Sequence, residues 1–143
     1  LEKALWTIPA RRMKARREHI VPLPTQAVEL LKAMHPITGH TKFVFPNRDD
    51  RQRPMADAAL RQALKKLGWA TKYSPHGTRT TGSTRLNEMG YRPDAIEAQL
   101  AHAEPNSVRR TYNHATYLDE RRVMMQDWAH KLDQWKSTHS KGQ

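Results

Sequence analysis

Apolar and polar residues alternate in a short stretch near the start of the chain. Over residues 5–8 this alternation puts Trp6 and Ile8 on one face, as in a half-buried strand, and a second short strand is predicted over 19–23. Together they predict an antiparallel hairpin with a strongly basic turn. The cations of that turn are Arg11, Arg12, Lys14, Arg16 and Arg17.

After the hairpin, apolar residues recur with a helical period. Thr25 can cap a first helix, and Gly68 can end a second one. In each helix the apolar residues fall on one face, because they recur every three or four positions. These faces consist of Ala27, Leu30, Leu31 and Met34 in the first helix and Leu60, Leu64 and Leu67 in the second.

Three further helices with tight joints are predicted between residues 74 and 114. Pro75 can start the first and Gly90 can end it, while the second turns Ile96 and Leu100 inward. The third begins near residue 106. The first is rich in Gly, Ser and Thr, which give a helix little to bury, so it is either a weak surface helix or one whose polar face is functional. Its small residues would also let its backbone lie close to neighbouring helices.

A last helix follows Thr116 and Asp119, which form a capping-box-like pair. It carries an apolar seam that would pack on its own core or on a neighbouring subunit. The seam consists of Leu118, Met125, Trp128, Leu132 and Trp135. The polar segment over 137–143 is predicted to be a disordered tail.

Composition narrows the class of protein. The 143 residues suit one domain, mainly α with a small antiparallel β-sheet (α+β), and the net charge of +11 favours nucleic acid over a membrane surface as partner. No apolar run approaches the roughly 18 residues that span a bilayer. The lack of cysteine and of a signal peptide fits a reducing cytoplasm.

Five polar residues together contain what metal-free phosphoryl transfer to a protein side chain requires. Arg79 can hold two phosphate oxygens in a bidentate fork, and the imidazoles of His76 and His102 can donate to the same oxygens or move protons. Tyr112 would supply the nucleophilic oxygen, and Lys14 is a further cation in the basic hairpin. No cofactor is needed for such a reaction.

Each of these residues also has a plainer interpretation. His76 and Arg79 can be a solvated helix face, the basic turn can be simply solvated, and Tyr112 can be a half-buried core residue with Tyr117 as its rival. The eight histidines lack the spacing and the carboxylate partners of a metal site, so none is predicted. A phosphate-binding loop of the G-x-x-x-x-G-K-[ST] type is absent from the sequence.

Two long stretches carry a specific resemblance. "SPHGTRTTGSTRLNEMGYRPDAIEAQLAH" and "NSVRRTYNHATYLDERRVMMQDWAHKLD", together with "WTIPARRMKARREHIVPL" near the start, resemble the C-terminal catalytic domain of tyrosine recombinases, in particular P4-like phage integrases. The resemblance runs over nearly the whole chain. It implies that Lys14 is the hairpin lysine, His76 and Arg79 the His-x-x-Arg pair, His102 the third basic residue and Tyr112 the nucleophile.

The family also has an earlier catalytic arginine, which this chain lacks. The resemblance places it upstream of Leu1, so the expected fold is an N-terminally truncated recombinase catalytic domain over 1–136, followed by the tail. Removal of one such electrostatic interaction commonly costs on the order of a hundredfold in rate. The isolated chain is therefore expected to be weak or inactive.

The resemblance implies site-specific integration or excision of phage or genomic-island DNA through a 3′-phosphotyrosyl intermediate. It implies double-stranded DNA with attachment sites as partner, self-association in a synaptic complex, and a bacterial cytoplasmic location on the nucleoid. The alternatives are a regulator derived from a recombinase that binds DNA without cutting it, and a basic helical interaction protein without DNA chemistry.

Overall fold

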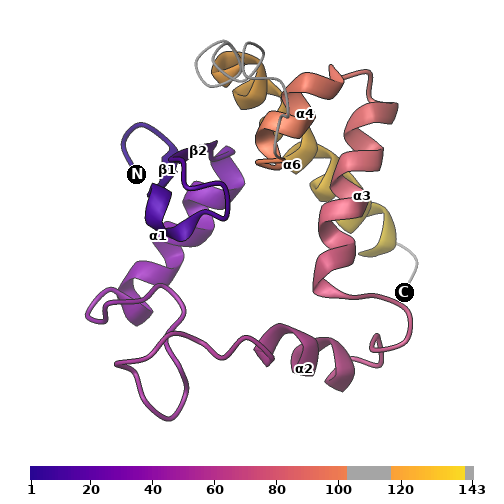
Figure 1. Ribbon diagram of the computed structural model, residues 1–143. Coiled ribbons are helices and arrows are strands. Elements are labelled where there is room, and N and C mark those ends of the chain that lie inside the picture. Colours follow the sequence, from indigo (N-terminus) through magenta and orange to yellow (C-terminus); the bar gives the residue numbers. More distant parts are fainter. Residues whose placement is uncertain (103–116, 141–143) are drawn as a thin grey trace. The chain divides into compact units, whose positions relative to one another are not determined.

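The computed structural model describes residues 1–102 and 117–140 (Figure 1). Within them the fold is mainly helical with one small antiparallel sheet, which confirms the predicted α+β class. The predicted helix that contains Tyr112 lies outside the described residues. The elements are β1 (Leu5–Ile8), the 3-10 helix η1 (Ala10–Arg12), β2 (His19–Pro22), α1 (Thr25–Thr38), α2 (Ala59–Lys66), α3 (Pro75–Glu88), α4 (Pro93–Gln99) and α6 (Leu118–Ser140).

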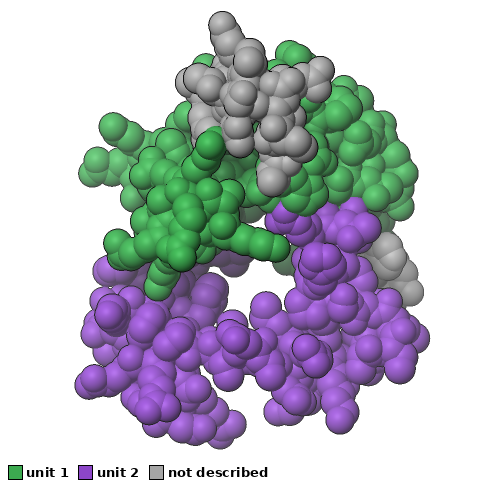
Figure 2. Space-filling model, in the orientation of Figure 1, with its two compact units in different colours: residues 1–28, 82–143 green, residues 29–81 purple. Residues whose placement is uncertain are grey.

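The described chain divides into two compact units (Figure 2). Unit 1 combines residues 1–28 with the described part of 82–143, and unit 2 consists of residues 29–81. Helices α1 and α3 each contribute residues to both units. The sequence pattern did not indicate this division, and a single catalytic domain over 1–136 stays a prediction.

The basic hairpin forms as predicted, in unit 1. Strands β1 and β2 pair antiparallel, with Leu5 opposite Pro22 and Ile8 opposite His19. His19 and Pro22 are buried, whereas Trp6 is 56% exposed. The alternating pattern therefore located the strand correctly but overestimated how much of the indole this two-stranded sheet covers.

The core of unit 1 lies where α3, α4 and α6 meet. Leu86 of α3, Ala95 and Ile96 of α4 and Met124 of α6 are buried in one cluster, and Leu100 packs against it. This confirms the inward positions predicted for Ile96 and Leu100. The partly buried residues around the cluster are Tyr91, Leu100, Tyr117, Met125 and Trp128.

Helix α6 buries part of the predicted seam, since Met125 and Trp128 pack against the core, but its most buried residues lie beside that seam. Arg121, Met124 and Ala129 are its most buried residues, whereas Leu132 is 44% exposed. Spacings of three and four residues place Arg121, Met124 and Trp128 on one side of the helix, and this side includes a charged residue that the apolar pattern passes over. The helix also continues to Ser140, past the expected boundary at residue 136, and residues 141–143 lie outside the described chain.

The start of α1 is tied to α6 by a glutamine rather than capped by its own threonine. The backbone N–H and the hydroxyl of Thr25 both donate to Oε1 of Gln126, at 2.9 and 3.0 Å. The amide of Gln126 in turn donates to Oε1 of Gln26 at 2.9 Å. The helix start is therefore satisfied by a tertiary contact, where the sequence predicted a local cap.

The predicted apolar stripes of α1 and α2 have the right spacing but are only partly buried. Ala27, Leu31, Met34 and Leu64 are half-buried. Leu30, Leu60 and Leu67 are 70%, 55% and 71% exposed. Gly68 does end α2, with a φ of 75° that a left-handed helix terminus requires. Burial of an amphipathic stripe needs a partner surface, and the described residues do not supply one to these leucines.

Even the 23-residue helix α6 is too polar to cross a bilayer, and within the described chain no other helix qualifies.

Helix α3 starts at Pro75 and is stopped by Gly90, which has a φ of 84°. Its glycines are not required by close helix packing. A Cβ atom added at Gly82 would lie 4.0 Å from Cζ2 of Trp128, an ordinary van der Waals distance. Gly82 therefore weakens the helix without providing a closer contact to its neighbour.

Replacement of Gly82 by alanine is expected to stabilise unit 1 by roughly 0.5–1 kcal/mol, because glycine inside a helix costs about that much in conformational entropy. Urea unfolding monitored by circular dichroism measures the change. Gly90→Ala is the matched control. It should destabilise by about 1 kcal/mol, because alanine is strained at the positive φ of that position. Equal effects of the two substitutions would contradict this account.

Candidate functional site

The turn of the hairpin holds Lys14 among exposed arginines. Tight turns shape its backbone: Arg12 N–H donates to the Pro9 carbonyl at 2.9 Å, and Arg16, with a φ of 53°, donates to the Met13 carbonyl at 3.0 Å. Within the described chain none of the five cations has a carboxylate partner. They are therefore hydrated and available to an external anion.

A buried guanidinium anchors this hairpin to the helices. Arg121 of α6 is only 3% exposed, and it donates from Nη2 to the Ile20 carbonyl at 2.6 Å and from Nε to Oε1 of Gln99 at 2.9 Å. Nε2 of the buried His19 lies 3.2 Å from the Gln99 carbonyl oxygen. Burial lowers the pKa of Arg121 to about 10, which leaves it charged at neutral pH. Strand β2, α4 and α6 are thus joined at one point.

His102 lies just beyond the end of α4. Its backbone N–H donates to the Glu97 carbonyl at 3.1 Å, and its Nδ1 bonds the Glu97 carboxylate. Ala101, with a φ of 53°, reverses the chain between them. The carboxylate orients the imidazole through Nδ1, so Nε2 is the ring nitrogen that Glu97 does not engage.

His76 and Arg79 lie one turn apart on the exposed first half of α3. Ser74 supports the start of this helix, because its hydroxyl accepts from the Gly77 N–H at 3.1 Å.

The predicted site residues are divided between the two units and the residues that the structure does not describe. Lys14 and His102 belong to unit 1, His76 and Arg79 to unit 2, and Tyr112 lies outside the described residues.

Two other tyrosines near α6 have structural roles. The Tyr91 hydroxyl donates to the Asp127 carboxylate. Burial, and to a smaller extent this hydrogen bond, raises the pKa of Tyr91 to about 12. Tyr117 packs against the core, and the guanidinium of Arg92 lies 5.1 Å from its ring centroid. A raised pKa leaves less phenolate at neutral pH, and Asp127 already engages the Tyr91 hydroxyl, so both observations favour a structural role for Tyr91. The contacts of Tyr117 favour a packing role for that residue.

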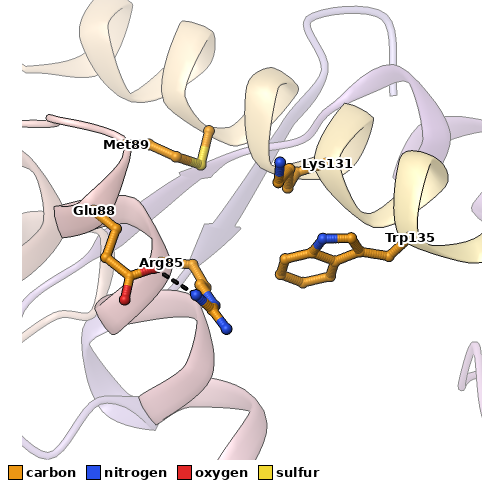
Figure 3. Close-up of a pocket in the computed structure, with 5 residues that line it drawn as sticks. All are labelled: Arg85, Glu88, Met89, Lys131 and Trp135. Carbon is orange, nitrogen blue, oxygen red and sulfur yellow. Dashed lines mark hydrogen bonds and ion pairs between the residues drawn. The ribbon is translucent and has the colours of Figure 1, made fainter.

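A pocket of about 380 Å³ lies between α3 and α6 in unit 1 (Figure 3). In it Arg85 pairs with Glu88 at 2.6 Å and lies 5.7 Å from the ring of Trp135. None of the four predicted site residues that the structure describes lines it. The lining residues are Arg85, Glu88, Met89, Lys131 and Trp135.

Over the described ranges 1–102 and 117–140, no group of three His, Asp or Glu residues is arranged to hold a metal ion.

Comparison with known sequences decides the family. The family model described as "Phage integrase family" matches residues 1–119, most of the chain. The chain belongs to the phage integrase family.

Individual integrases match over nearly the same range. The chain is 50% identical over 134 residues to prophage integrase IntZ of Escherichia coli (strain K12), covering 93% of the chain and 33% of that protein. It is 48% identical over 124 residues to prophage integrase IntA of the same strain, covering 87% and 30%. It is 42% identical over 148 residues to the integrase of Enterobacteria phage P4, covering 92% and 34%. The chain thus spans about a third of the length of these integrases, and no solved structure gives a significant match.

Sequence reasoning on this chain missed the residues that join the hairpin to α4 and α6. Arg121 stands in the charged run "DERR", which is typical of a solvated helix face, and Gln99 and His19 belong to no motif. No local signal distinguishes a buried arginine from an exposed one. The helical phase of Arg121 relative to Met124 is the one available indication, since the two share a face of α6.

Tyr91→Phe is expected to lower the free energy of unfolding by about 1 kcal/mol, because it removes a hydrogen bond to a carboxylate. The pKa of Tyr91 is raised in the folded state, so this contribution is full below pH 10 and is lost as the pH rises toward 12. Denaturant unfolding at pH 8 and at pH 11 measures it. Tyr117→Phe is the control, because its hydroxyl makes only a 3.4 Å contact with Arg92 and should matter less. A larger effect in the control would contradict the assignment.

Proposed function

We propose that the chain belongs to the catalytic domain of a tyrosine-type site-specific DNA recombinase that integrates or excises phage or genomic-island DNA. The observation that carries the proposal is the family match over residues 1–119, which spans the hairpin lysine, the His-x-x-Arg pair, the third basic residue and the candidate tyrosine. The integrase names of the relatives support it. We propose residues 1–136 as the extent of this domain within the chain.

In the proposed reaction the Tyr112 oxygen attacks a scissile phosphate of duplex DNA. The phenolic proton passes to a neighbouring imidazole as an O–P bond forms. The bond from phosphorus to the 5′-oxygen breaks, and a 3′-phosphotyrosyl link and a free 5′-hydroxyl result. Lys14 protonates the departing oxygen. Because the ester conserves the energy of the broken bond, the 5′-hydroxyl of another strand can reverse the step without a nucleotide cofactor.

The phosphate charge would be met by side chains that the helices hold at their surface. Arg79 offers two parallel N–H donors to the non-bridging oxygens, and His76 one turn away offers a third. His102, oriented by the Glu97 carboxylate, offers Nε2 as a donor. Pre-oriented donors of this kind stabilise the charge that develops at phosphorus, which supports a reaction without a metal ion.

DNA binding in this proposal rests on the hairpin turn. Four arginines surround Lys14 there, exposed and without carboxylate partners in the described chain, so they can replace counterions on the phosphate backbone. The four are Arg11, Arg12, Arg16 and Arg17. Self-association in a synaptic complex belongs to the same proposal, and the exposed apolar residues Val123 and Leu132 of α6 are suited to such a contact.

A nicked suicide substrate tests the chemistry in the full-length protein. The wild type is expected to form an SDS-stable covalent adduct with DNA, Tyr112→Phe to form none, and Tyr117→Phe, the matched control, to retain it. The yield should be unchanged by EDTA. DNA binding without an adduct would instead favour a regulator that does not cleave DNA. An adduct that still forms with Tyr112→Phe would contradict the proposed mechanism.

The salt dependence of DNA binding tests the hairpin separately. Changing the four turn arginines to glutamine should flatten the slope of log K against log[salt] by roughly 0.9 for each phosphate that is no longer neutralised. Arg51→Gln with Arg53→Gln is the control in the 47–53 loop, where Arg51 contacts His40 and Arg53 pairs with Asp50. This control should leave the slope nearly unchanged. An equal change per arginine in both variants would mean that net charge, not the hairpin, governs binding.

A further inference from the structure

The proposed chemistry does not use the most buried cation of the described chain. Arg121 is 3% exposed, and the oxygens that its guanidinium contacts are neutral, a backbone carbonyl and a side-chain amide. Burial of a charge without a counter-charge is costly, and a well-packed apolar residue would often stabilise the fold more. Stability alone therefore does not explain a guanidinium at this place.

What the guanidinium provides is a geometric link between two parts of the proposed site. Its Nη2 holds the Ile20 carbonyl in β2, the strand that returns from the Lys14 turn. Its Nε holds the side chain of Gln99, the last residue of α4 and three residues before His102. The rigid fork of arginine can hold two acceptors at fixed angles, which the single ammonium of lysine does less well.

A second contact strengthens the same link. Nε2 of His19, which precedes Ile20 in β2, lies 3.2 Å from the Gln99 carbonyl oxygen. Two successive residues of the strand are thus tied to the same residue of α4, one directly and one through Arg121. This arrangement restrains sliding and rotation of the hairpin relative to the end of α4.

We infer that Arg121 is a positioning residue, which fixes the Lys14 hairpin against the end of α4 that carries His102 and thereby sets where the general acid meets the departing 5′-oxygen. The inference rests on the proposed function. Arg121 itself touches no reacting atom. Its removal should therefore affect protonation of the leaving group more than DNA binding or the attack by tyrosine.

A substrate that does not need the general acid tests this role. In a 5′-bridging phosphorothiolate the leaving group is a thiolate, which departs without protonation because thiols are far more acidic than alcohols. On the ordinary phosphodiester, Arg121→Met in the full-length protein should reduce the cleavage rate on the order of tenfold to a hundredfold. On the phosphorothiolate its rate should return close to that of the wild type, with DNA affinity unchanged on both substrates.

Three variants make the result decisive. Lys14→Ala should show the same selective rescue. Arg122→Met should react like the wild type on both substrates, because Arg122 makes only a 3.3 Å contact with the Lys3 carbonyl. The rate of Arg121→Lys on the phosphodiester should lie between those of the wild type and Arg121→Met. If Arg121→Met does not fold, Gln99→Met removes the same side-chain link from α4 and should give the same selective rate reduction. Thermal unfolding checks each variant.

Failure of the inference is distinguishable from failure of the proposed function. If the wild type forms an adduct through Tyr112 but Arg121→Met slows both substrates equally, or neither, the positioning role is overturned and the recombinase remains. If Lys14→Ala is not rescued, the link to the general acid is overturned in the same way. If the wild type forms no adduct with either substrate, the proposed function itself fails.

Discussion

One buried guanidinium determines how the described part of unit 1 holds together. Arg121 of α6 donates hydrogen bonds to the backbone of β2 and to the side chain of the last residue of α4, and both acceptors are uncharged oxygens. The apolar cluster around Ile96 and Met124 supplies the burial, but it is not directional and would tolerate small shifts between helices. The hydrogen bonds of Arg121 remove that freedom and connect the hairpin to the helices that the proposed chemistry needs.

Local signals in the sequence predicted the elements and their ends. The strands over 5–8 and 19–22, the stop at Gly68, the helix from Pro75 and the inward position of Ile96 all follow from alternation, helical period, proline or glycine, which act on a few neighbouring residues. The family could be identified in the same way, because its motifs are short and co-linear. These features need no knowledge of what packs against what.

Tertiary contacts are where prediction from the sequence failed. Leu60 and Leu67 have the spacing of a buried stripe, but they are exposed because spacing does not supply a partner surface. Leu132 was expected in the seam of α6, whereas Arg121 was not, since a charged residue normally lies in solvent. Within the described residues, the carbonyl of Ile20 and the side-chain amide of Gln99 make the burial of Arg121 tolerable. These two acceptors lie 22 and 101 positions away in the sequence, so the residues next to Arg121 give no indication that it is buried.

The candidate site combines both kinds of information. Its residues were named from sequence, whereas the structure adds how two of them are supported: Lys14 by an anchored hairpin and His102 by Glu97. The central claim is that Tyr112 carries the covalent bond to DNA. Peptide mapping by mass spectrometry of the trapped adduct tests it most directly. The account predicts a 3′-phosphate linked to the peptide that contains Tyr112, and a link to Tyr117, to another residue or to a 5′-phosphate would contradict it.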